Sequence, residues 1–127
     1  MTKKLRITLY ITGAHQAAFG SMVVFAPAVF QRITQTTLTD PRITLLYGSY
    51  LLIFSCVSFM AAREKEAASK LSLTVLLVVA ANCLVFGSLL LTGMETFARV
   101  GPVFLINAVL TSLVFLFRRQ PRVVGQL

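Results

Sequence analysis

Acidic residues are scarce in this chain, and none lies within a long apolar stretch. The 127 residues include only four Asp and Glu side chains, which are Asp40, Glu64, Glu66 and Glu95. They lie between apolar stretches that cover residues 8–30, 43–62, 71–93 and 100–117. Chemistry that depends on carboxylates inside such stretches is therefore excluded, including paired-carboxylate catalysis and proton-coupled export through a membrane acid.

Metal-ligating and redox residues are equally few. The chain has one histidine, two cysteines and no tryptophan. A single imidazole excludes bis-His haem ligation by the chain alone. The two cysteines, Cys56 and Cys83, lack the spacing of a metal site and are expected to pack as small buried thiols. No metal cluster, nucleophile–base pair or Gly-rich phosphate loop is present in the sequence, which predicts that the isolated chain is not an enzyme.

What the chain has in abundance is apolar sequence. Hydrophobic residues make up 57 % of it and charged residues 13 %, and its mean hydropathy is +0.82. Each apolar stretch has 18 to 23 residues, enough to cross a hydrocarbon core of about 30 Å as a helix. We therefore expect one membrane domain over residues 1–127, with four transmembrane helices and no extramembrane domain.

The basic residues are distributed unevenly between the two sides of such a four-span arrangement. Nine of the twelve fall on the side of the termini: Lys3, Lys4, Arg6, Arg63, Lys65, Lys70, Arg118, Arg119 and Arg122. The other three are Arg32, Arg42 and Arg99. This asymmetry predicts that both termini are cytoplasmic, in a bacterial inner membrane. The net charge of +8 then indicates contact with anionic lipid headgroups, and nucleic acid is not expected as a partner.

Prolines and short links divide the chain. Pro27 lies near the outer end of the first stretch, where it kinks or ends a helix. Asp40-Pro41 is a helix start signal, and Gly101-Pro102 is expected to open the last helix. The short links after the second and third stretches favour antiparallel neighbours. The predicted fold is an all-α, up-down-up-down four-helix bundle with both termini inside.

Small residues mark the expected helix contacts, because lipid gives no hydrophobic drive for helix association. On the first helix they recur every four residues, the second and fourth helices carry them roughly on one face, and the third carries two closely adjacent stripes, Ala80 with Gly87 and Ala81 with Ser88. The positions are Gly13, Ala17 and Ser21, then Gly48 and Ser55, and finally Gly87. These stripes predict packing within the bundle, and the groove on the first helix leaves self-association open as an alternative.

Four polar residues within the stretches are the candidates for ligand binding: His15, Gln16, Asn82 and Asn107. Polar groups at membrane depth generally face protein or a cavity. The simplest expectation is a neutral, buried His15 that pairs with a hydroxyl near Ser55, while the two asparagines bond across helices. The alternatives are that His15 ligates the metal of a tetrapyrrole or bonds a quinone carbonyl. No other metal site and no obligatory cofactor are predicted.

Residues 41–63, together with the preceding Ala26-Pro27 helix end, resemble the small bacterial DoxX-like four-helix membrane families. The shared features are a glycine early in the second helix, here Gly48, and a basic residue where that helix leaves the membrane, here Arg63. The resemblance implies a four-helix bundle and an association with quinone-linked redox complexes.

Two functions from different classes follow from these observations. The first is a structural or accessory subunit of a larger membrane assembly, favoured by the small size and the small-residue faces. The second is a binder of a lipophilic small molecule, such as a quinone, a lipid or a tetrapyrrole, within the bundle.

Overall fold

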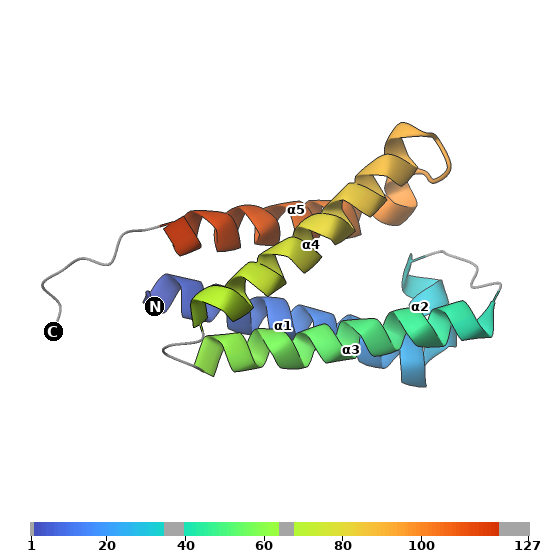
Figure 1. Ribbon diagram of the computed structural model, residues 1–127. Coiled ribbons are helices and arrows are strands. Elements are labelled where there is room, and N and C mark those ends of the chain that lie inside the picture. Colours follow the sequence, from blue (N-terminus) through green and yellow to red (C-terminus); the bar gives the residue numbers. More distant parts are fainter. Residues whose placement is uncertain (1, 35–39, 64–67, 120–127) are drawn as a thin grey trace, which may run out of the picture.

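The computed structural model describes residues 2–34, 40–63 and 68–119, and the described chain is helical (Figure 1). Its elements, in chain order, are α1 (Lys3–Phe25), α2 (Pro27–Thr34), α3 (Pro41–Arg63), α4 (Ala68–Leu91) and α5 (Phe97–Arg119). No strand occurs in the described ranges. The predicted all-α fold class is confirmed at this level.

Three of these helices, α3, α4 and α5, are long and apolar enough to cross a membrane. The pair α1 and α2 meets the same requirement only when its two helices are taken together. Three basic residues at its start, Lys3, Lys4 and Arg6, together with His15 and Gln16, make α1 less apolar than the other long helices. The chain is therefore a membrane protein with three candidate spans, and with a fourth only if the bent pair of α1 and α2 forms one span.

The break falls at Ala26, inside the single helix expected over residues 8–30. There α1 ends and α2 leaves at an angle of 118°. Ala26 has φ −139° and ψ 58°, outside the helical region. The ring of Pro27 disfavours a helical conformation at the residue before it, while proline itself suits the first position of a new helix. Of the two expectations for Pro27, a kink or a helix end, the helix end is the one observed, and Pro27 itself begins a new helix.

The other helix boundaries follow local signals. As predicted from Asp40-Pro41, α3 begins at Pro41, and the Asp40 carboxylate accepts a hydrogen bond of 2.8 Å from the Arg42 backbone N–H. Gly93 follows α4 with φ 68°, a conformation that glycine adopts without strain.

The expected start of the last helix at Gly101-Pro102 is wrong. α5 begins at Phe97, three residues before the predicted span of 100–117 and four before Gly101, and Pro102 lies inside it. The backbone N–H groups of Arg99 and Val100 both bond the Thr96 carbonyl, so the first turn forms ahead of the proline.

The four long helices pack in a closed cycle of neighbours. α1 packs most extensively on α3 and α4 on α5, while α3 also contacts α4 and α1 also contacts α5. Successive long helices run in opposite directions (Figure 1). α4 is inclined to the other helices, so the turn between α4 and α5 lies apart from α2.

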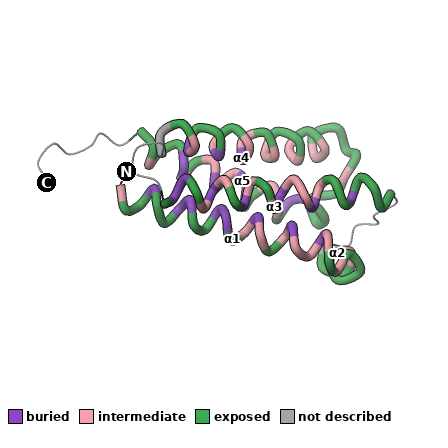
Figure 2. Tube along the Cα trace, turned by 60° about the horizontal axis from the view of Figure 1, so that its bottom comes forward, coloured by how far each residue is buried: buried purple, intermediate pink, exposed green. Residues whose placement is uncertain are grey.

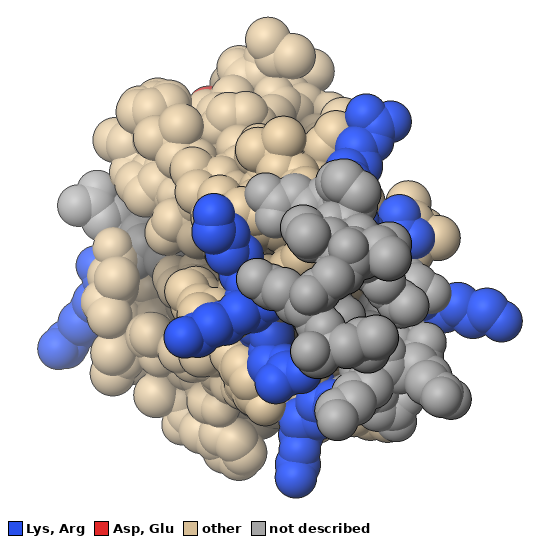
Figure 3. Space-filling view, turned by 90° about the vertical axis from the view of Figure 1, so that its left-hand side faces the viewer, with Lys and Arg blue, Asp and Glu red and all other residues tan. Residues whose placement is uncertain are grey.

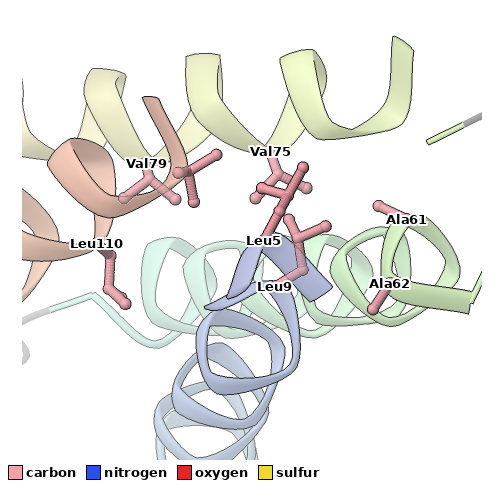
Figure 4. Close-up of a cluster of buried hydrophobic side chains, with 8 residues drawn as sticks. Leu5, Leu9, Ala61, Ala62, Val75, Val79 and Leu110 are labelled. Atoms are coloured by element: carbon pink, nitrogen blue, oxygen red, sulfur yellow. The ribbon is translucent and has the colours of Figure 1, made fainter. Parts of the chain in front are cut away.

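The apolar core lies at the end of the molecule where α1 begins and α5 ends. It combines the start of α1 with the end of α3, the start of α4 and the end of α5 (Figure 4). Its buried members are Leu5, Leu9, Ala61, Ala62, Val75, Val79, Leu110 and Val114. Buried positions are densest there, whereas α4 is mostly exposed or half-buried along its length (Figure 2). The helices are therefore joined tightly at this end and less tightly at the other.

Basic side chains surround the same end (Figure 3). The helices that meet there begin or end at Lys3, Arg63 and Arg119. Lys4 lies 5.9 Å from the centre of the Phe117 ring, a cation–π contact that joins α1 to α5, and Arg119 lies 4.5 Å from the centre of the Phe115 ring.

Candidate functional site

A small cavity lies between all four long helices, and the four polar candidates line it together. His15 and Gln16 come from α1, Asn82 from α4 and Asn107 from α5. The rest of the lining comes from Phe19, Tyr47, Leu51 and Val103. Residues that are far apart in the sequence thus meet at one depth of the helix assembly.

Two serines of α3 form hydrogen bonds with α1 beside the cavity. The Ser58 hydroxyl is within hydrogen-bond distance of two acceptors, Gln16 Oε1 at 3.1 Å and the Phe54 carbonyl of its own helix at 2.8 Å, and Gln16 and Ser58 are both buried. The Ser55 hydroxyl donates to the Gly13 carbonyl at 2.9 Å. Cross-helix hydrogen bonds of this kind hold membrane helices in register.

The expected pairing of His15 with a hydroxyl near Ser55 is not formed. Consecutive residues of a helix point about 100° apart, so Gln16 faces α3 and His15 points to its side. The His15 ring is half-buried and contacts Phe19, with 4.6 Å between ring centres. Neither His15 nor Asn82 has a hydrogen-bond partner within the described part of the chain.

The two asparagines share the cavity without bonding each other. Asn107 is buried, and its Nδ2 donates to the Val103 carbonyl one turn earlier on α5, at 2.8 Å. The side-chain oxygen of Asn107 is therefore the acceptor that can bond a molecule in the cavity. Asn82 is half-buried on α4. The cavity is thus lined by donors and acceptors from three helices.

The volume of the cavity limits what it accepts. It measures about 20 Å³, which is enough for one water molecule. Ligand sites for cofactor-sized molecules have volumes of about 300–1,000 Å³. Neither a quinone ring nor a tetrapyrrole fits between these helices unless they move apart. Among the described residues there is also no group of three or more His, Cys, Asp or Glu side chains placed to hold a metal ion.

Several of the predicted packing glycines lie where helices approach closely. A Cβ atom added at Gly13 would lie 2.9 Å from the Phe59 ring, and one added at Gly48 would lie 2.6 Å from Val24 Cγ2. At Gly87 the nearest atom would belong to Phe104 of α5, at 3.1 Å. Gly13 therefore faces α3 within the same chain, while Ala17 and Ser21 are half-buried.

The small residues of α4 divide between two faces. Gly87 packs on α5, whereas Ala81 and Ser88 are exposed on the outer side. Their neighbours on that face are large and apolar, with Leu77 61 %, Leu84 72 % and Val85 58 % exposed. We define these five residues as the α4 outer face.

Some residues of the site could not be expected from polarity alone. Tyr47 and Phe19 line the cavity, and their aromatic character indicated only a membrane interface or core.

Cys56 is exposed on α3, so the expectation that it is buried is wrong, while Cys83 is half-buried and both thiols are free.

Comparisons with protein-family models, with curated proteins and with solved structures give no match to this chain. The site is therefore interpreted from its own geometry.

Proposed function

We propose that this protein is a four-span integral membrane protein of the bacterial inner membrane, with both termini in the cytoplasm, and that it serves as an accessory subunit of a larger membrane assembly. In this arrangement α1 and α2 together form the first span of an up-down-up-down four-helix bundle. The nine-to-three distribution of basic residues supports the orientation. The DoxX-like resemblance of residues 41–63 favours a quinone-linked redox complex as the assembly.

The observation that carries the proposal is the α4 outer face. Only 17 % of the most apolar stretch of α4 is buried, against 28 % in α3 and in α5. Ala81 and Ser88 lie seven residues apart and form a shallow strip between the large side chains of Leu77, Leu84 and Val85. Small residues between large apolar ones let the backbone of a second transmembrane helix approach closely. Ser88 bonds the Leu84 carbonyl of its own helix at 2.8 Å, so the strip presents no unpaired hydroxyl to that helix.

The test is gentle detergent extraction of the tagged chain, followed by mass spectrometry of what co-purifies. We expect a partner at a fixed ratio to the chain. Ala81→Phe should lower its recovery about ten-fold or more, because a bulky ring on the strip costs the packing energy of the contact. Val109→Phe is the matched control, since Val109 is similarly exposed, at 55 %, on α5. Equal recovery with both variants, or a chain that always purifies alone, would contradict the accessory role.

The second candidate, a binder of a lipophilic small molecule in the bundle, is favoured by the convergence of His15, Gln16, Asn82 and Asn107 on one cavity. It requires the helices to separate, since the cavity holds about 20 Å³. An absorption spectrum and a lipid extract of the same preparation test it. A bound chromophore or quinone that is lost in His15→Leu would place this function ahead of the accessory role.

A further inference from the structure

A second and larger cavity lies at the elbow between α1 and α2, away from the polar cavity. It has a volume of about 330 Å³, within the range of ligand sites. It is formed by the last turn of α1, one face of α2 and the first turn of α3. The lining is Val23, Val24, Pro27, Gln31, Pro41, Thr44 and Leu45.

The chemistry of the lining suits a hydrocarbon chain. Five of the seven residues are apolar, and the Thr44 hydroxyl is already bonded to the Asp40 carbonyl at 2.9 Å. The Gln31 amide is the one polar side chain of the lining without a hydrogen-bond partner in the described ranges. An ester carbonyl near the end of an acyl chain would satisfy it, because an unpaired amide is costly near lipid.

The geometry of α2 places this cavity in the boundary between headgroups and acyl chains. If α1 runs along the membrane normal, a bend of 118° turns α2 about 28° past the membrane plane and back toward the bilayer. Over the eight residues of α2, at 1.5 Å per residue, its far end lies about 6 Å deeper than its start. Interfacial helices are buried by about 5–10 Å in the same boundary. Val29 and Ile33, one turn apart, are 48 % and 63 % exposed and would meet lipid.

Charge at the elbow favours an anionic headgroup. Arg32 follows Gln31 in the sequence of α2, and Arg42 follows Pro41 at the start of α3, so two helices that form the cavity each carry one exposed arginine outside its lining. No ion pair involves either of them within the part of the chain that the structure describes. The one acid nearby in sequence, Asp40, accepts the Arg42 backbone N–H through its carboxylate. Two exposed arginines on the helices that form an apolar cavity are complementary to a phosphate attached to an acyl chain.

We infer that the elbow is a binding site for one anionic phospholipid of the outer leaflet, with an acyl chain in the 330 Å³ cavity and its phosphate at Arg32 and Arg42. This inference rests on the membrane orientation of the proposed function and does not depend on the α4 outer face.

The test uses the full chain, purified in mild detergent, stripped of lipid and then titrated with dioleoyl phosphatidylglycerol. Native mass spectrometry counts the lipids that remain bound. We expect one tightly held lipid per chain. Leu45→Trp should fill the cavity and lower retention about ten-fold or more. Leu46→Trp is the matched control, because the neighbouring Leu46 is 71 % exposed and does not line the cavity.

The headgroup contact is tested separately. Replacing both Arg32 and Arg42 by Gln should weaken phosphatidylglycerol binding about 30-fold, since each arginine near an anionic surface contributes about a factor of five. Arg99→Gln, on the same side of the protein, should change it less than about two-fold, because Arg99 lies 3.8 Å from Glu95 and belongs to another turn.

Three results would overturn the inference: no retained lipid on the unmodified chain, equal retention by Leu45→Trp and Leu46→Trp, or oleate bound as tightly as phosphatidylglycerol. Reporter fusions that place the termini test the membrane orientation independently. A wrong orientation can therefore be distinguished from a wrong lipid site.

Discussion

At the scale of single residues, the polar groups of the membrane stretches divide into those that are satisfied within the protein and those that face the cavity. Ser55, Ser58 and Gln16 form hydrogen bonds between α1 and α3. His15 and Asn82 face the cavity instead. A polar group in lipid is tolerated when protein or water satisfies it, so the first set should contribute to stability and the second to what the cavity accepts.

The Gln16–Ser58 bond should be measurable as a coupling energy. A double-mutant cycle of Gln16→Leu and Ser58→Ala is expected to give about 0.6–1.7 kcal/mol, the range found for hydrogen bonds between membrane helices. The free energy of unfolding in bicelles is the measurement. A parallel cycle of Gln16→Leu with Ser112→Ala should give no coupling, because the exposed Ser112 hydroxyl bonds Ala108 of its own helix and, unlike Ser58, does not also bond Gln16. Equal coupling in both cycles would show that the α1–α3 bond is not specific.

Gly48 should be the least replaceable glycine of the helix contacts. A Cβ there would lie 2.6 Å from Val24 Cγ2 and 3.0 Å from Val23 Cγ1, and these short, branched side chains cannot swing aside. Gly48→Ala is expected to lower the free energy of unfolding by about 1–3 kcal/mol through overpacking. At Gly87, where a Cβ would lie 3.1 Å from the Phe104 ring, the same substitution should cost less. A larger loss at Gly87 than at Gly48 would contradict the α1–α3 packing described here.

At the scale of elements, the sequence predicted the helices well and the bends poorly. Hydropathy indicated the locations of α3, α4 and α5, and Asp40-Pro41 predicted the start of α3, because both signals are local. The 118° turn at Ala26 was not predicted. A proline signal cannot tell a kink from a full break, which depends on whether α2 finds contacts of its own. One such contact is Phe30 of α2, whose ring lies 6.3 Å from that of Phe19.

The candidate site was predictable in its residues and not in its contacts. Polarity within apolar stretches singled out His15, Gln16, Asn82 and Asn107, and these four line one cavity. Depth along a helix can be counted from sequence, whereas rotation about the helix axis cannot. His15 was therefore expected to face Ser55. In the structure Ser55 bonds the Gly13 carbonyl, and Gln16, the residue after His15, bonds Ser58. Packing of α1 against α3 decides that rotation.

The bend at Ala26 should depend on Pro27. In a cysteine-free background, spin labels at Ala14 and Ile33, both exposed, would lie about 16 Å apart along the bent axis and about 28 Å apart along a continuous helix, at 1.5 Å per residue. Pro27→Ala removes the steric block at Ala26 and is expected to shift the distance distribution toward the longer value. Pulsed electron paramagnetic resonance measures it. If the unsubstituted protein already gives a distance distribution centred near the longer value, the bend is contradicted. If Pro27→Ala leaves the distribution unchanged, the bend is caused by the contacts of α2 and not by Pro27.

At the scale of the whole molecule, the chain has one tight, basic end and one looser end. The apolar core and the cation–π contact between α1 and α5 gather at the end where α1 begins and α5 ends. The polar cavity lies beyond this core, and the α1–α2 elbow lies at the far end. Such a division suits the proposed orientation and accessory role, in which the basic end would face the cytoplasm and the other half would meet lipid and partners.

The central claim is that α1 and α2 complete a fourth span, so that both termini lie in the cytoplasm. The measurement that tests it most directly is a pair of fusions in a bacterial host, with a reporter active only outside the inner membrane placed at the N-terminus of one chain and at the C-terminus of another. A third fusion, in the turn at Met94, serves as the positive control because that turn joins α4 to α5 on the opposite side. We predict activity at Met94 and none at either terminus. Activity at the N-terminus alone would show that α1 and α2 enter and leave the membrane on the same side, and would contradict the four-span account.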